Sequence, residues 1–158
     1  MEVIDVFVDL DDTFLGFTQR CNEVRSKNPE IKYPQSLYRF YAELEPLKGA
    51  VEALLAIERD QRYKVWFCTA PSIKNRLCYT EKADSIHRIL GEEWLERLFI
   101  APDKSKMTDG ILIDDSKSGR GQETYRGELI HFLTDDFPNW ASVLDHLGVE
   151  RPPELADF

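Results

Sequence analysis

The sequence predicts an α/β fold with three layers, αβα, around a central parallel sheet. Five short runs rich in Val, Ile, Leu and Phe recur along the chain, at residues 3–10, 63–70, 98–102, 110–115 and 128–133. Their nearly continuous apolar character is typical of strands buried on both faces. Helical patterns lie between the runs, at residues 47–60, 79–91, 92–98 and 139–148. This alternation is typical of a parallel sheet with helices on both sides.

Residues 14–46 interrupt that alternation. The segment has no strand pattern and contains three prolines. We interpret it as a short helical insertion between the first strand and the first core helix, within a single domain of residues 1–158. The Pro-rich, acidic residues 150–158 are interpreted as a loosely docked C-terminal tail.

Composition and charge limit the location and partners of the chain. Its 20 Lys and Arg residues against 29 Asp and Glu residues give a net charge of −9. An acidic chain argues against a nucleic-acid surface or an anionic membrane surface, because both require a basic face. The three cysteines show no CxxC spacing, and neither a signal peptide nor an apolar run of membrane-spanning length is recognisable. We therefore expect a soluble cytoplasmic protein.

Polar side chains stand where four of the predicted strands end. They are Asp9, Asp11, Thr69, Lys104, Asp114 and Asp115. In an open parallel sheet, ligands bind beyond the carboxyl ends of the strands. Carboxylates this close together repel unless a cation neutralises them, and hard oxygen ligands favour Mg²⁺. A hydroxyl, an ammonium and backbone N–H groups would complete a cradle for a phosphoryl group, so the sequence predicts a metal-phosphate site.

Each of these residues has an alternative interpretation when it is taken singly. Asp12 is better explained as a turn residue, and Asp114 and Asp115 alone would fit a turn and helix cap equally well. Lys104 alone would be a solvated surface lysine, and Lys106 competes with it for the same role. The conjunction of all the features at strand ends favours a site.

The motif order Asp9-Leu10-Asp11-Asp12-Thr13, Thr69, Lys104 and Asp114-Asp115 resembles the haloacid dehalogenase superfamily of phosphohydrolases. The stretches VWFCTAPSIKNRLCYTEKADSIHRILG and LERLFIAPDKSKMTDGILIDDS are similar to the 5'(3')-deoxyribonucleotidases, which remove phosphate from deoxynucleoside monophosphates. This similarity covers most of residues 3–118. It implies a Rossmann-like fold with a cap inserted after the first strand.

The resemblance also implies a role for each motif residue. Asp9 would be the nucleophile that forms an aspartyl-phosphate, and Asp11 would protonate the leaving group and then deprotonate water. Thr69, Lys104 and the backbone N–H of Ala70 would hold the phosphoryl oxygens. The 5'(3')-deoxyribonucleotidases usually carry a serine at the position of Ala70, so one hydroxyl contact is absent here.

The same resemblance implies a Mg²⁺ cofactor and a small phosphorylated substrate. Asp9, the backbone carbonyl of Asp11 and Asp114 would bind the metal, with Asp115 in support. The insertion is shorter than the cap of the family, and a homodimer is one way in which a second subunit would complete it. Residues of this region and of the second motif that could contact the substrate are Lys74, Phe14, Phe17, Tyr38, Phe40 and Tyr41. The aromatic residues could equally pack the insertion onto the core.

Three functions follow from these residues. The first is a Mg²⁺-dependent deoxyribonucleotidase. The second is a phosphatase for another phosphoester, such as a nucleic-acid end, a phosphoprotein or a small metabolite. The third is a catalytically silent binding domain, which Asp9 and Asp11 argue against because a silent domain has no chemical need for both.

Overall fold

The computed structural model describes residues 2–158. Its strands and α-helices are, in chain order, β1 (Ile4–Val8), α1 (Phe17–Lys27), α2 (Ala50–Arg59), β2 (Tyr63–Thr69), α3 (Cys78–Leu90), β3 (Leu98–Ile100), β4 (Ile111–Asp114), β5 (Glu128–His131) and α4 (Trp140–Leu147). Five 3-10 helices join them: η1 (Pro34–Ser36), η2 (Glu92–Arg97), η3 (Lys104–Lys106), η4 (Gln122–Thr124) and η5 (Pro153–Leu155). Within the described range, no helix is both long enough and apolar enough to cross a lipid bilayer.

A five-stranded, all-parallel sheet with the order β3-β2-β1-β4-β5 forms the centre of the molecule. The chain runs outward from β1 to β3 and then returns to the other side of β1 with β4, so the direction of winding reverses between β1 and β4. In open α/β sheets this reversal is where ligands bind, beyond the carboxyl ends of the strands. The predicted α/β fold with a central parallel sheet is confirmed.

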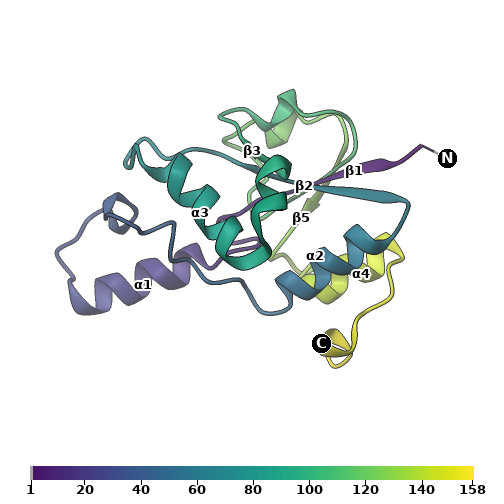
Figure 1. Cartoon of the computed structure of the whole chain (residues 1–158), viewed down its shortest axis with the longest axis horizontal. Helices are drawn as coiled ribbons and strands as arrows, with labels where there is room; N and C mark the ends of the chain where they lie inside the picture. Colours follow the sequence, from purple (N-terminus) through teal and green to yellow (C-terminus); the bar gives the residue numbers. More distant parts are fainter. Residues whose placement is uncertain (1) are drawn as a thin grey trace.

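The two faces of the sheet are covered differently. Because side chains alternate along a strand, Val6 and Val8 lie on one face and Phe7 on the other. The Val6 face belongs to the main core, which includes buried side chains from all four α-helices. Figure 1 shows α2 and α4 close together beside the sheet. The Phe7 face forms a small cluster with Leu112 and is covered by Met107 and Tyr125, which follow η3 and η4. The layer on that face therefore consists of 3-10 turns and loops.

The insertion lies at the end of the sheet toward which the strands point, where α1 projects from the molecule (Figure 1). It is attached to α3 at several points. Arg88 of α3 donates hydrogen bonds to the carbonyls of Ala42, at 3.3 Å, and Leu44, at 2.6 Å. Glu81, two turns earlier on the same face of α3, accepts the backbone N–H of Tyr41 at 3.2 Å. The end of the insertion is thus tied to the core helix that follows β2.

The C-terminal tail is firmly docked, so the prediction of loose docking is wrong. Leu155 in η5 is fully buried. Its side chain fills the space beside Gly49, where a Cβ would come within 2.3 Å of Leu155 Cδ2 and where φ is 78°. Arg151 also donates to the carbonyl of Phe158 at 3.2 Å. The proline-rich, acidic composition of the tail hid its two anchoring apolar residues, Leu155 in the main core and Phe158 packed against that core.

Candidate active site

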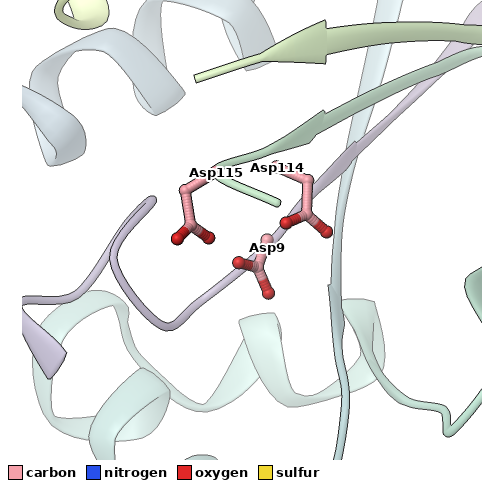
Figure 2. A group of neighbouring side chains, drawn as sticks. All are labelled: Asp9, Asp114 and Asp115. Carbon is pink, nitrogen blue, oxygen red and sulfur yellow. The ribbon is translucent and has the colours of Figure 1, made fainter. Parts of the chain in front are cut away.

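The register of β1 and β4 brings Asp9 beside Asp114. Val8 pairs with Ile113, and the N–H of Asp9 donates to the carbonyl of Ile113 at 2.9 Å. One carboxylate oxygen from each of Asp9, Asp114 and Asp115 lies within 4.8 Å of the others. Figure 2 shows the three carboxylates gathered around one point, with Asp9 following β1 and the other two at the end of β4. The cluster therefore sits at the reversal of the sheet.

Lys104 supplies an ammonium group to this cluster from η3. Its Nζ lies 2.8 Å from Asp9 Oδ1 and 2.5 Å from Asp114 Oδ2, and the side chain is buried. Burial by itself lowers the pKa of Lys104, but the charges of Asp9 and Asp114 outweigh it and raise that pKa above its ordinary value. Lys104 is therefore a permanent cation in the site.

The three carboxylates nevertheless outnumber this ammonium. Burial and then the charge of Asp9 raise the pKa of Asp114 above its ordinary value. The same two causes, in the same order, raise the pKa of Asp115 to about 8. Burial and the repulsion between the carboxylates both disfavour their charged forms, so a bound cation would stabilise the ionised cluster. Three converging carboxylate oxygens are the donor set that a hard divalent cation prefers, so the residues fit such an ion.

Neutral side chains orient the carboxylates. Gln122 Nε2 donates to Asp114 Oδ2 at 3.1 Å. Thr13 Oγ1 lies 3.2 Å from Asp9 Oδ2 and 3.3 Å from Asp115 Oδ1, and it accepts the backbone N–H of Asp115 at 3.1 Å. Because a hydroxyl has one proton, Thr13 can donate to only one of the two carboxylates at a time. Such supporting bonds hold a metal-binding carboxylate in place before the ion arrives.

A second polar group adjoins the first and is centred on Lys82 of α3. Its Nζ lies 3.0 Å from Asp11 Oδ2, 2.6 Å from Thr69 Oγ1 and 4.9 Å from the centroid of the Tyr41 ring, and the side chain is buried. The other carboxylate oxygen of Asp11, Oδ1, is buried and accepts no hydrogen bond from the described residues. A buried polar atom without a partner is costly. Asp11 Oδ1 is therefore available to a proton carried by a ligand.

Several known proteins with the same name are similar in sequence to this chain. The human cytosolic-type 5'(3')-deoxyribonucleotidase is 30% identical over 133 residues, which are 82% of this chain and 60% of the human protein. The human mitochondrial 5'(3')-deoxyribonucleotidase is 36% identical over 119 residues, 72% of this chain and 47% of that protein. A protein of Vibrio phage KVP40, provisionally given the same name, is 28% identical over 149 residues, 92% of this chain and 85% of its own length. The chain resembles the 5'(3')-deoxyribonucleotidases.

The resemblance to the deoxyribonucleotidases that the motifs predicted is thereby confirmed. No protein-family model matches the chain. This chain spans 60% of the length of the human cytosolic-type deoxyribonucleotidase. The phage deoxyribonucleotidase relative, in contrast, is matched over most of its own length.

The aromatic residues that were candidates for substrate contact lie mostly in the core. Phe14 is fully buried with its ring centroid 5.0 Å from that of Phe67, so it has no surface with which to stack on a base. Phe17 is half-buried and packs against Phe40 and Tyr41, both of which are buried. For Phe14 the prediction of substrate contact is therefore wrong, because the core of the sheet takes up the whole ring.

The remaining candidates lie at the exposed side of the edge. Ala70 directly follows Thr69 at the end of β2 and is half-buried. Lys74 is exposed, and its Nζ lies over the ring of Tyr33 at 4.4 Å from the centroid. Asp12 is a turn residue, as predicted. Its φ is 61°, and its carboxylate accepts hydrogen bonds from the N–H and the hydroxyl of Thr18 at the start of α1.

Sequence reasoning missed three residues of the site: Lys82, Thr13 and Gln122. A signal for Lys82 was present, because it occupies the same helical face as Cys78 and Ile86, which are buried. A lysine on an otherwise apolar stripe requires a buried partner. Thr13 stood within the first motif without an assigned role. Gln122 begins the short 3-10 helix η4, which no sequence pattern predicts, so no local signal pointed to it.

Proposed function

We propose that the chain is a Mg²⁺-dependent phosphomonoesterase of the deoxyribonucleotidase type, acting on deoxynucleoside monophosphates through an aspartyl-phosphate on Asp9. The observation that supports this most is the convergence of Asp9, Asp114 and Asp115 beside Asp11 and two buried lysines. The names of the relatives support the substrate class. The carboxylates of Asp9 and Asp114 and the carbonyl of Asp11 would hold Mg²⁺, with Asp115 in support, and the ion would supply the positive charge that the cluster lacks.

The reaction then has two steps that this chain's own residues carry out. A carboxylate oxygen of Asp9 forms a bond to phosphorus as the ester bond breaks, and Asp11 gives its proton to the departing alkoxide. Water next attacks the phosphorus of the aspartyl-phosphate while Asp11 takes a proton from it, which releases inorganic phosphate and restores Asp9. Lys82, Lys104 and Thr69 would stabilise the charge on the phosphoryl oxygens during transfer.

The test is phosphate release, with Mg²⁺, from deoxynucleoside 5'- and 3'-monophosphates, ribonucleotides, sugar phosphates and an aryl phosphate. We expect deoxynucleoside monophosphates to be preferred, and a chelator to abolish release until Mg²⁺ is restored. Asp9→Asn should lower kcat by about 10³-fold or more, because it removes the nucleophile.

The matched control is Asp12→Asn, which changes a carboxylate of the same motif whose contacts are with Thr18. Asparagine tolerates a positive φ, so this variant should fold and keep its kcat within about threefold of the parent. Equal activity of Asp9→Asn and Asp12→Asn would exclude the mechanism. Release from the aryl phosphate alone would retain the chemistry and exclude the nucleotide substrate.

A further inference from the structure

Three segments near the edge of the sheet that carries the aspartates are basic, unlike the rest of the chain. Residues 31–38, 70–80 and 116–121 contain five of the 20 Lys and Arg residues and none of the 29 Asp and Glu residues. All five side chains are exposed, and none forms an ion pair with another described residue. They are Lys32, Lys74, Arg76, Lys117 and Arg120.

Direct contacts join the three segments into one surface, which we call the basic rim. Asn75 Nδ2 donates to the carbonyl of Gln35 at 2.9 Å, which joins the second segment to the insertion. Arg120 Nη2 donates to the carbonyl of Pro71 at 3.2 Å, which joins the third segment to the second. The second and third segments follow the ends of β2 and β4. The basic rim therefore borders the edge of the sheet that carries the aspartates.

Exposed aromatic and aliphatic side chains accompany these charges. Of the eleven large apolar side chains that the described residues expose, six lie in the basic rim: Tyr33, Leu37, Tyr38, Ile73, Leu77 and Tyr79. Tyr38 is 76% exposed and Ile73 is 88% exposed. An open depression of about 670 Å³, lined in part by Ser36, Ile73 and Lys74, crosses the rim between the insertion and the second segment. Exposed tyrosines beside unpaired cations are the combination that stacks bases and binds phosphates of single-stranded nucleic acids.

We propose that the basic rim binds a single-stranded oligonucleotide whose terminal phosphate enters the site. Bases would stack on the exposed tyrosines, and the backbone phosphates would bind the basic side chains. The hydrolysis of this phosphate rests on the proposed function. As with a mononucleotide, water is consumed, inorganic phosphate is released, and the end of the oligonucleotide becomes a hydroxyl. The acidic remainder of the surface would repel nucleic acid elsewhere and so direct it to the rim.

Charge complementarity favours this occupant over a second copy of the chain. In a two-fold dimer the same patch meets itself, so the five unpaired cations of each rim would face one another. Like charges at an interface oppose association. A polyanion with flat, stackable groups meets no such repulsion and also covers the exposed tyrosines.

The first measurement is binding of a fluorescent octathymidylate without a terminal phosphate, followed by fluorescence anisotropy. The second is KM for thymidylates of increasing length, from mononucleotide to octanucleotide, each with a terminal phosphate. We expect KM to fall about tenfold between the mononucleotide and the tetranucleotide, because one stacked base contributes roughly that factor. The affinity should also weaken as salt rises, since phosphate contacts release counterions.

Matched variants distinguish the effect of the rim cations on binding from the effect of the net charge of the protein. Arg76→Gln/Lys117→Gln removes two rim cations and should abolish the length dependence to within about twofold, without changing kcat on the mononucleotide. Lys27→Gln/Arg59→Gln removes the same charge from the exposed ends of α1 and α2 and should keep the length dependence. Tyr38→Ala should weaken octathymidylate binding about threefold or more, through lost stacking.

The two proposals are tested separately. The mononucleotide assay tests the proposed function, and fluorescence anisotropy tests binding of the oligonucleotide to the basic rim. If the protein hydrolyses the mononucleotide but its KM does not change with oligonucleotide length, the proposal that the basic rim binds an oligonucleotide is wrong. The proposed nucleotidase function then still stands. Equal binding of polyglutamate or of a blunt duplex overturns recognition of a single strand. A dimer that Tyr38→Ala dissociates would show that a second copy covers the rim instead.

Discussion

Two buried lysines reach the edge of the sheet that carries the aspartates from opposite faces, and they contact different groups. Lys104 comes from the side of Phe7 and Leu112, where only loops and 3-10 turns cover the sheet, and binds Asp9 and Asp114. Lys82 comes from α3 on the main-core side and binds Asp11 and the neutral hydroxyl of Thr69. The first lysine therefore balances two carboxylates, whereas the second contacts one carboxylate and one neutral hydroxyl.

Because of this difference, we expect Lys104 to matter mainly for the stability of the fold and Lys82 mainly for catalysis under the proposed function. Removing Lys104 leaves two carboxylates buried and uncompensated, and that cost falls on the folded state itself. Removing Lys82 leaves one carboxylate that is still 29% exposed at its side chain and can recruit water. We therefore expect the two lysines to respond differently to the same substitution.

The largest effect should come from Lys104→Met in the metal-free protein. The loss of the ammonium should lower the free energy of unfolding by about 3–5 kcal/mol, as for other broken buried ion pairs. Urea denaturation monitored by tryptophan fluorescence measures this change. Mg²⁺ should recover part of the loss, since the ion supplies charge to the same carboxylates. A variant as stable as the parent would show that the carboxylates do not depend on Lys104.

Lys82→Met should mainly affect catalysis. We expect kcat to fall by about 10²–10³-fold, the range for removal of one donor to a developing charge, and unfolding free energy to fall by about 1–2 kcal/mol. Steady-state kinetics and urea denaturation on the same preparations give both values. Lys82→Arg is the conservative partner, and Lys64→Met is the control, because Lys64 is an exposed lysine that lies over Trp66. If Lys82→Met lost more stability than Lys104→Met, the comparison between the lysines would be wrong.

The smallest effect should be a pH dependence that Asp115 carries in the metal-free protein. The ordinary pKa of 3.8 is raised to about 8 in the fold, so between these values the folded state holds a proton that the unfolded state has lost. Stability should therefore fall as the pH rises through this window. Because Asp115 is partly exposed and screened, the effect should be small. Between about pH 5 and about pH 8, we expect the Tm of Asp115→Asn to decrease by about 2–4 °C less than the Tm of the parent protein does. A parallel decline in both proteins would remove Asp115 as the cause.

The sequence was sufficient to predict the parallel sheet and the acidic part of the site. Asp9 directly follows β1 and Asp114 ends β4, while Lys104 follows β3 after a gap of three residues. Their side chains could therefore be brought together from topology alone. The convergence of Asp114 with Asp9 needed only the order of the strands, which the sheet confirms.

The residues that were missed or misassigned depend on packing between elements. Lys82 lies inside a helix, and its partners Asp11 and Thr69 are distant in sequence. Phe14 looked available to a ligand because it follows the first motif, yet the turn at Asp12 directs the chain back into the core. A loop or turn direction is set by tertiary contacts, so composition and periodicity do not reveal it.

The attachment of the insertion to α3 has a kinetic consequence. Arg88 and Glu81 hold the backbone at Ala42, Leu44 and Tyr41, and Lys82 on the same helix lies against the ring of Tyr41. These bonds fix the end of the insertion to the helix that carries Lys82. Under the proposed function, we therefore expect a turnover that does not include the opening and closing of a lid.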